Sequence, residues 1–552
     1  MKSFREEVLA LTKELVQHPS IVGTIGERDI AYKIYDLLKQ IPYFKDHPAY
    51  LRLVPTEGDD RERYNVFALV KGAKKPKKET IILMGHMDTV GIEDYGKWKS
   101  LAFSPDALAE RLRHGKVKES VRKDLESGEW MFGRGSVDMK SGVASHLALI
   151  RHFASQPNSL NGNVLLLVEC DEEEDSHGIL SALKDLQYLA QKENLTYIAA
   201  INADYTSRRY EGDENRYVYL GTVGKLLPSF FIAGKETHVG QAFEGFDPNL
   251  VAAELTSRID YNTDFCDEMF GEITIPPVSL KQTDLKESYD VQTPFAAFVY
   301  YNFFVHSWSP KDVLLRLKEV ARLAFEQAIT KMHTRYRQYC ELSGEPYLPE
   351  EIVPRVYTYE EFYQKCLQIH GDAFAQGMRN FAFTLLNEDG LDLRIFNCKM
   401  VEEMWRWADE DSPAIILFFS SVYAPRVVLN ETDPRDRRLI EAVYTAVDEL
   451  QPRCPHPIQV RNFFPYISDM SYIAISDDEG GIRALEKNMP AWGIKHRLDV
   501  EAIRSLDIPV VNVGPYGMDA HSQWERVEIP YSMEIVPQMT ASIIRTLFSS
   551  AE

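Results

Sequence analysis

A histidine and an aspartate two positions apart, His86 and Asp88, stand shortly after the apolar run of residues 80–83. In extended backbone, residues i and i+2 point to the same side, so the two side chains would share one face at the end of a strand. A carboxylate beside an imidazole is the usual way to orient a metal-binding histidine. A hydrogen bond within a loop explains the pair equally well, so the choice depends on whether the chain supplies further ligands.

Further acidic or histidine side chains follow other predicted strands: the cluster 171–175 after residues 163–169, Asp204 after residues 196–202, and His521 after residues 508–513. Open α/β sheets collect their ligands at the carboxyl ends of strands, so these groups can converge although they are far apart in sequence. Asp138 lies between glycine-rich turns, on a backbone that is free to bend toward a metal.

The donor types indicate a hydrolytic metal site. Two imidazoles and several carboxylates, without cysteine, suit zinc, cobalt or manganese rather than a structural thiolate site. The carboxylates are too many for one tetrahedral ion, whereas two ions about 3.5–4 Å apart, bridged by one carboxylate and one water, would use them all. The sequence therefore predicts two divalent metal ions, most simply zinc.

The elements that must position these residues alternate between strand and helix. Apolar periodicity predicts helices at residues 3–17, 27–40, 143–154, 178–193 and 435–450, together with the strands named above. This alternation is the signature of a doubly wound α/β domain. Residues 64–70 and 81–84 are predicted to form a hairpin or neighbouring strands around a solvated lysine-rich turn at 74–78.

The pattern of apolar and polar residues changes after residue 222. Apolar runs at 226–232 and 296–306 and an amphipathic stretch at 310–339 indicate a two-layer α+β unit, while residues 340–412 have no assigned fold. Predicted strands and helices alternate again beyond residue 430. We therefore expect a catalytic domain made of residues 1–222 and 431–552, with a second domain inserted at 223–430. The charged, helix-prone residues 106–129 are predicted to be a smaller surface insert.

Composition narrows the class of protein. A formal net charge of −21 over 552 residues argues against binding to nucleic acid or to an anionic membrane through bulk charge. The six cysteines show no CxxC spacing and indicate reduced thiols. The charged N-terminus lacks the apolar core of a signal peptide, and the apolar runs are too short to span a bilayer. We expect a cytoplasmic protein with no nucleic-acid or membrane partner.

Six blocks, taken in order, resemble the family of di-zinc exopeptidases and amidohydrolases that includes carboxypeptidase G, acetylornithine deacetylase, succinyl-diaminopimelate desuccinylase, tripeptide aminopeptidase and aminoacylase. The matching blocks are residues 85–88, 133–140, 171–173, 204–206, 234–240 and 520–525. Within that family, the length and the enlarged insert resemble the RocB type of arginine-utilisation protein. The resemblance implies a doubly wound, mixed-sheet catalytic domain of the zinc exopeptidase kind, with an inserted α+β lid domain.

The resemblance also implies a ligand set. His86 and Asp204 would hold one ion, Glu173 and His521 would hold the other, and Asp138 would bridge both.

Further roles follow from the same resemblance. Asp88 would orient His86, and Glu172 would act as the general base that carries a proton from the bridging water to the leaving amine. A shift of one residue within the acidic run would put Glu174 in the place of Glu173, so that register stays open.

Three substrate-binding candidates complete the set. His238 matches a lid residue that, in dimeric relatives, reaches the partner's active site, so a homodimer through the lid is expected. The enlarged insert leaves open whether His238 acts in the partner's site here. Arg461 and Asn462, with the loop 468–471, lie where relatives contact their substrates.

The predicted function is metal-dependent hydrolysis of an amide bond in a small peptide or an N-acylated amino acid, in the breakdown of arginine or related amino acids. Two alternatives stay open: a deacylase or ureido-amide hydrolase of the same family, and a non-catalytic binding protein that keeps the fold.

Overall fold

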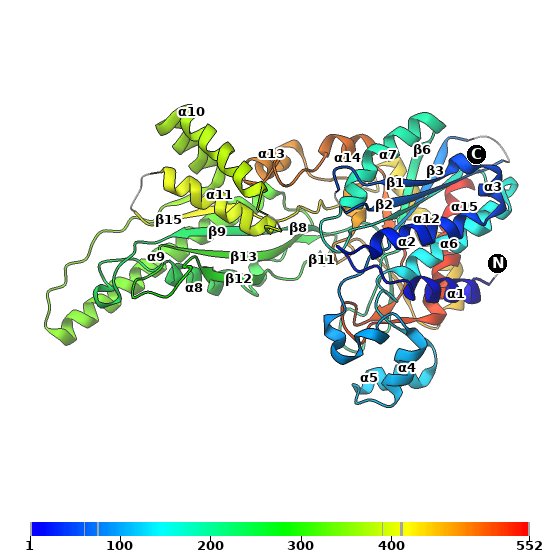
Figure 1. Ribbon diagram of the computed structural model, residues 1–552, viewed down its shortest axis with the longest axis horizontal. Helices are drawn as coiled ribbons and strands as arrows, with labels where there is room; N and C mark the ends of the chain where they lie inside the picture. The colour runs from blue at the N-terminus through cyan, green and yellow to red at the C-terminus, as the bar shows by residue number, and fades with distance from the viewer. Residues whose placement is uncertain (1–2, 60, 74–76, 389, 409–411, 550–552) are drawn as a thin grey trace. The chain divides into compact units, whose positions relative to one another are not determined.

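The computed structural model describes residues 3–59, 61–73, 77–388, 390–408 and 412–549. The chain divides into two compact units: the first holds the described residues of Met1–Thr222, Val427–Ile475 and Asp499–Glu552, and the second those of Val223–Arg426 and Ser476–Leu498. The colours of Figure 1 show that the first unit is built from both ends of the chain.

The structure differs from the predicted boundaries at two places, of which the smaller is the return to the first unit at Val427 instead of residue 431. Residues 431–552 were expected to return to the catalytic domain as one segment, whereas residues 476–498 belong to the second unit. In that segment, helix α13 (Glu479–Lys487) packs against the long helix α9 (Pro310–Ser343) of the same unit. Its buried residues Ile482 and Leu485 are three positions apart and give it an apolar face for this contact.

The first unit is organised around a mixed sheet, with its strands in this order across the sheet: β1 (Leu51–Pro55), β2 (Tyr64–Lys71), β5 (Asn163–Glu169), β3 (Glu79–His86), β6 (Thr196–Asn202), β17 (Val510–Asn512), β7 (Arg216–Tyr219) and β16 (Ile458–Arg461). β3 runs parallel to both β5 and β6, and β17 runs parallel to β6. The carboxyl ends of these four strands therefore meet at one edge of the sheet.

The predicted pairing of residues 64–70 with 81–84 is wrong. β5 lies between β2 and β3 and pairs with both. Every residue of β5 is buried, and so apolar a strand is most stable at a central position, where neighbouring strands and both layers cover it. Of the predicted lysine-rich turn, residues 74–76 lie outside the described residues.

Helices cover both faces of this sheet. Ile81 and Leu83 of β3 belong to a hydrophobic cluster with buried residues of α1 (Arg5–Val16), α2 (Gly26–Lys39), α6 (Lys140–Ser155), α12 (Pro434–Leu450) and α15 (Val536–Ser549). Ile82 and Met84 point to the other face and are also buried. The buried residues of α7 (His177–Glu193) and α14 (Val500–Leu506) lie outside that cluster, which indicates that these helices cover the other face. The doubly wound arrangement is thus confirmed.

A helical insert interrupts this domain; it was predicted at residues 106–129, and in the structure it begins earlier and spans residues 93–129. It consists of a 3-10 segment η2 (Glu93–Leu101) and the helices α4 (Pro105–Arg113) and α5 (Glu119–Ser127). Its small hydrophobic core includes Leu108, Val121 and also Phe132 of the next strand. That strand, β4 (Trp130–Phe132), pairs with β19 (Arg526–Glu528), and β19 pairs with β18 (Gly517–Met518). The insert is therefore joined to a second, small sheet of the first unit.

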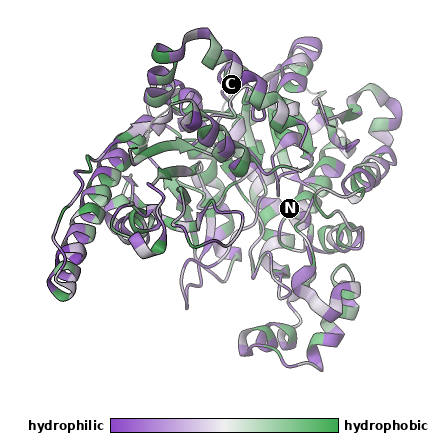
Figure 2. Ribbon diagram, turned by 60° about the vertical axis from the view of Figure 1, so that its left-hand side comes forward, coloured by the Kyte–Doolittle hydropathy of each residue, from purple (hydrophilic) through white to green (hydrophobic). Residues whose placement is uncertain are grey.

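The second unit has its own mixed sheet, with its strands in the order β12 (Val278–Asp284), β13 (Ala296–Val305), β9 (Pro228–Ala233), β15 (Ala414–Phe419) and β14 (Val356–Thr358); β8 (Gly224–Leu226) also pairs with β13. α8 (Pro248–Ile259) and α9 lie on one face, and α10 (Tyr359–Leu386) and α11 (Leu393–Trp407) on the other (Figure 1). Figure 2 shows strands that are mostly hydrophobic and helices with hydrophilic outer faces. This is the predicted inserted α+β unit.

Residues 340–412, which had no assigned fold, contribute most of one layer. α10 begins with a capping box, in which Thr358 Oγ1 accepts from the Glu361 N–H and Glu361 Oε2 accepts from the Thr358 N–H. Gly371, at φ 59°, bends α10 into two helical parts, a conformation that glycine adopts without strain. Phe374 of α10 and Phe396 of α11 pack on Phe298 of β13 in one buried cluster.

No helix in the described ranges has an apolar stretch long enough to cross a membrane. None of the six cysteines, all of which are described, is bonded to another.

Candidate metal centre

His86 is the last residue of β3, at the carboxyl edge of the main sheet. Its ring Nδ1 faces Asp88, at 3.2 Å from the backbone oxygen and 3.5 Å from Oδ1. The same Asp88 carboxylate accepts hydrogen bonds from the backbone N–H groups of Glu172 and Glu173, at 3.3 and 3.1 Å. Asp88 thus fixes the imidazole and the acidic loop together, and the ring Nε2 is left to face the centre.

Asp138 lies in the turn between β4 and α6, and the peptide bond that joins it to Met139 is cis. Glu525 Oε1 accepts from the backbone N–H groups of Val137 and Asp138, at 3.2 and 3.4 Å. Glu525 is in turn paired with the buried Arg134 at 2.7 Å. A fully buried ion pair therefore holds the turn that presents Asp138.

The Asp138 carboxylate stands between the two histidines. Its Oδ1 lies 3.1 Å from His86 Nε2, and its Oδ2 lies 3.0 Å from His521 Nε2. His521 Nε2 is also 3.2 Å from Glu173 Oε2. Each oxygen of one carboxylate therefore faces a different imidazole, which is the arrangement of a bridging ligand.

The acidic run after β5 divides its side chains between several partners. Glu172 Oε2 lies 3.7 Å from His86 Nε2, whereas Glu173 faces His521. Glu174 instead pairs with Arg61 at 2.6 Å, and both of these side chains are nearly half exposed. Of the two registers left open by the sequence, the one that places Glu173 in the centre is the one that this geometry supports.

Asp204 follows β6, the neighbour of β3, and is buried. Its backbone N–H donates to Asn512 Oδ1 at 2.9 Å, and its Oδ1 accepts from the Tyr205 N–H at 2.7 Å. Asp138 contributes to raising the pKa of Asp204, so the two carboxylates lie close enough to repel. Asp204 thus follows the strand beside β3, at the same edge of the sheet as His86.

Burial dominates the electrostatics of Glu172, Glu173 and Asp204, whereas at Asp138 the hydrogen bonds with His521 and His86 outweigh burial and lower the pKa. Burial raises the pKa of Glu172 well above its usual range; His86 opposes this effect, and Glu173 and Asp204 add to it. Burial, followed by repulsion from Asp138, raises the pKa of Asp204 to about 7 and also raises that of Glu173. Glu172, Glu173 and Asp204 therefore resist ionisation unless further cations are present.

The pKa values of the two histidines are also raised, which for an imidazole means that the charged form is stabilised. Burial disfavours the charged form of His86, but Glu172 and Asp138 outweigh burial, and its pKa is raised. Hydrogen bonds with Asp138 and then with Glu173 raise the pKa of His521 to about 11. Both imidazoles therefore face concentrated negative charge, which is the environment that attracts divalent cations.

The donors fit metal ions in type and spacing. One ligand atom each from His86, Asp138 and Glu173 lie within 4.8 Å of one another. Ligand atoms about 2.0–2.1 Å from a tetrahedral zinc ion stand about 3.3 Å apart, close to the 3.0–3.2 Å between His521, Asp138 and Glu173. Imidazole nitrogens and carboxylate oxygens are ligands that zinc, cobalt and manganese all accept.

The substrate candidates of the first unit lie at the end of β16. Arg461 pairs with Tyr219 of β7, and Tyr219 pairs with Asn512 of β17. With neighbouring strands about 4.8 Å apart, this places the Arg461 backbone about 10 Å from Asn512, the partner of Asp204. Asn462 follows directly, and its carbonyl oxygen approaches Gly221. Both residues are half-buried.

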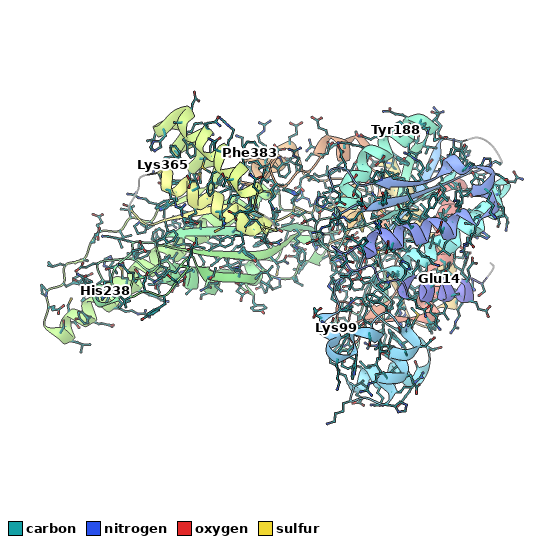
Figure 3. The ribbon with its side chains drawn as sticks, in the orientation of Figure 1. Glu14, Lys99, Tyr188, His238, Lys365 and Phe383 are labelled. Carbon is teal, nitrogen blue, oxygen red and sulfur yellow. The ribbon has the colours of Figure 1, made fainter. Side chains whose placement is uncertain are left out.

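His238 belongs to the second unit, where it is exposed at the start of a short 3-10 turn (Figure 3). Its Nδ1 accepts from the Gly240 N–H at 3.1 Å, and its backbone bridges to Gln292. Large apolar side chains near this bridge are also exposed: Val239, Tyr289 and Val291.

Comparison with known proteins agrees with this geometry. The model of Peptidase family M20/M25/M40 matches residues 82–531, a range that contains all the metal-ligand candidates. The chain belongs to this family. It is therefore a hydrolytic enzyme of the metallopeptidase and amidohydrolase kind, and the resemblance predicted from the six blocks is confirmed.

Curated relatives from this family match almost the whole chain. Protein RocB of Bacillus subtilis is 36% identical over 96% of this chain and 93% of its own length. The uncharacterized protein YqjN of the same organism is 35% identical over 99% and 97%. A succinyl-diaminopimelate desuccinylase of Coxiella burnetii is 27% identical over 42% of this chain and 51% of its own.

Solved structures of the family share the fold. The metallo-carboxypeptidase Sso-CP2 of Sulfolobus solfataricus gives a TM-score of 0.53 at 14% identity, covering 98% of this chain and 99% of that one. A Staphylococcus aureus tripeptidase gives 0.52 at 14% identity, covering 99% of each chain. At this identity the likeness extends to the fold alone.

Two buried acids at the centre of this M20 enzyme were not assigned to the metal centre from the sequence. Glu525 holds the Asp138 turn, as described above, and its only local signal is its place four residues after His521. Asp469 is fully buried and adds to the raised pKa of Glu172. It lies in the loop 468–471, which had been interpreted as a substrate loop, and no sequence pattern marks it as a neighbour of Glu172.

Proposed function

We propose that this enzyme uses two divalent metal ions, most simply zinc, to hydrolyse an amide bond in a small peptide or an N-acylated amino acid. His86 and Asp204 would hold one ion, Glu173 and His521 would hold the other, and Asp138 would lie between them as a shared ligand. The observation that carries the proposal is the Asp138 carboxylate, whose two oxygens lie 3.1 and 3.0 Å from the two imidazoles.

When bound, the two ions supply Lewis acidity, lower the pKa of a water toward neutrality, and polarise the scissile carbonyl. The residues of the chain perform the remaining work. Glu172 lies beside the pair, 3.7 Å from His86 Nε2, and its buried carboxyl has a high affinity for a proton. Glu172 accepts the proton of the attacking water and returns it to the leaving amine, as a general base and then a general acid.

Asp88 fixes the relative positions of His86, Glu172 and Glu173. It holds the His86 ring in one tautomer and also binds the backbone N–H groups of Glu172 and Glu173. Glu172 and Glu173 are therefore fixed relative to His86 by a single buried carboxylate. A partner of this kind raises the basicity of the imidazole and sets its orientation.

The substrate is proposed from resemblance rather than from a pocket. The similarity to Protein RocB along almost the whole chain supports a substrate from the breakdown of arginine or related amino acids. Arg461, Asn462 and His238 are proposed to bind the substrate. Deacylation or ureido-amide hydrolysis is the second candidate, supported by the match to a desuccinylase.

We further propose a homodimer through the second unit, supported by the exposed apolar side chains near His238, and a cytoplasmic location, supported by six cysteines that form no disulfide. Light scattering of the purified protein tests the dimer. In a dimer in which His238 acts on the partner, mixing His238→Ala with Glu172→Gln subunits restores part of the activity. A monomer with full activity would overturn both the dimer and the trans role.

A substrate screen tests the proposed activity. Dipeptides and N-acyl amino acids, arginine derivatives included, are incubated with purified enzyme and added zinc, cobalt or manganese. We expect hydrolysis of at least one class, loss of that activity with a chelator and recovery with metal, while Glu172→Gln stays inactive with its metal bound. Protein with only trace metal, in which Asp138→Ala changes nothing, would refute the proposal.

A further inference from the structure

We propose that the helical insert, residues 93–129, positions His521, and that Asp124 of α5 acts on this histidine through Arg526 and Asp519. The inference rests on the proposed function, because it takes His521 as a metal ligand. It assigns a role in the metal centre to a segment that carries none of the proposed ligands.

His521 needs such support because of where it stands. It lies in the loop between β18 and β19, and its side chain is 52% exposed. Both His521 and Asp519 have left-handed backbone conformations, with φ of 60° and 56°. Aspartate and histidine adopt this conformation more often than most residues, but it is less stable for them than for glycine, and contacts from the surrounding structure help to hold it. The loop therefore depends on contacts outside itself.

Arg526 provides the first of these contacts. Its side chain is 1% exposed, and its Nη1 donates to Asp519 Oδ2 at 2.5 Å and to the backbone oxygen of Trp524 at 3.0 Å. These two partners stand on either side of His521. One guanidinium thus closes the loop across its base.

The insert holds that guanidinium from the other side. Arg526 Nε donates to Asp124 Oδ2 at 2.6 Å, and Asp124 is only 18% exposed. The rings of Trp130 and Phe132 lie 5.4 and 5.8 Å from the guanidinium carbon. Arg526 is therefore a buried cation shared by one carboxylate of the insert and one of the loop. Removing either carboxylate leaves the other to fix Arg526 alone.

Apolar packing makes the same connection independently. Trp524, three residues after His521, packs against the hydrophobic core of the insert, and its ring meets Trp98 of η2 edge-on at 6.4 Å. The loop is thus attached to the insert at Arg526 by charge and at Trp524 by packing. His86, by contrast, ends a strand of the main sheet.

The test is a cobalt(II) titration of the metal-free protein, followed by visible absorption. Wild-type protein is expected to bind cobalt in two steps, and His521→Ala to lose or weaken one of them. Asp124→Asn keeps the shape of the side chain but loses its charge, and it should weaken that same step about tenfold, as the loss of a supporting residue behind a ligand does. Asp124→Glu, which restores the charge, should recover part of this loss.

Glu110→Gln is the matched control. Glu110 also lies in the insert, but its carboxylate pairs with Arg113 and His114 at the surface. Both cobalt steps should be unchanged in this variant. In a His521→Ala background, Asp124→Asn should leave the remaining step as it is, because its effect passes through His521.

Several results would overturn the proposal. One is an Asp124→Asn protein that has a lower melting temperature but binds both cobalt ions as the wild type does, since the insert would then support only the stability of the fold. Another is an equal weakening of both steps. Wild-type protein that binds no cobalt would refute the proposed function as well, and this result is recognised before any variant is compared.

Discussion

The two histidines of the metal centre are held in opposite ways. His86 ends a central strand, its side chain is 1% exposed, and Asp88 orients its ring. His521 stands on a loop with left-handed backbone, and its side chain is 52% exposed. Yet their Nε2 atoms lie at nearly equal distances, 3.1 and 3.0 Å, from the two oxygens of Asp138.

The difference shows two ways to place a ligand. A residue at the end of a buried strand takes its position from the sheet, so a single carboxylate is enough to set the ring. A residue on a loop has no such frame and needs contacts from elsewhere, here Arg526 and the insert. The His86 side should therefore tolerate changes at the surface that the His521 side does not.

Replacing Asp138 should abolish metal binding on both the His86 and the His521 side, because this carboxylate faces both histidines. Asp138→Ala should lose both metal ions, and activity should fall by more than about a thousandfold, since the reaction loses its Lewis acids. Metal content by mass spectrometry and kcat/KM measure the two effects. Asp106→Ala, an exposed carboxylate of α4, should match the wild type. An Asp138→Ala enzyme that keeps one tightly bound ion would show that the carboxylate does not bridge.

Glu172→Gln should separate catalysis from metal binding on the His86 side. Both ions should stay bound, while kcat falls by about 10²–10⁴, the range that general acid–base catalysis contributes. Steady-state kinetics on protein of known metal content gives the answer. Full turnover with both ions in place would assign the base to another residue.

Asp88→Asn should weaken the His86 side in preference to the His521 side. The amide orients the ring less strongly than the carboxylate, and losing such a partner typically costs 10–100-fold in metal affinity. In a cobalt titration, the step that His86→Ala removes should shift more than the step that His521→Ala removes. An equal shift of both steps would mean that Asp88 acts mainly through the backbone of Glu172 and Glu173.

Glu174→Gln should have the smallest effect. Glu174 pairs with Arg61 at the surface, and exposed ion pairs of this kind contribute about 0–1 kcal/mol to stability. Metal content, kcat and melting temperature should all stay close to the wild type. Loss of one ion would reverse the register and make Glu174 the ligand in place of Glu173.

Much of the fold could be predicted because its elements carry local signals. The strand 163–169 and the helices at 178–193 and 435–450 have clear apolar patterns, and the structure confirms them. The order of strands was harder, since apolar periodicity does not say that β5 separates β2 from β3. The helix α10 was missed in an aromatic-rich segment, although Thr358 and Glu361 form the capping-box pattern that marks its start.

The candidate site could be read from the sequence because its ligands follow strands whose carboxyl ends meet at one edge. The structure brings His86, Asp138 and Glu173 together, while their metal-binding roles stay predictions. The supports of His521 could not be predicted. Asp124 and Arg526 are 402 residues apart, and an ion pair between distant segments leaves no pattern in either of them.

The most direct test of the central claim is anomalous X-ray diffraction at the zinc edge from crystals of the zinc-loaded enzyme. Two peaks about 3.5–4 Å apart are predicted, one between His86 and Asp204 and the other between Glu173 and His521, with Asp138 between them. A single peak, or peaks away from Asp138, would contradict the two-metal account.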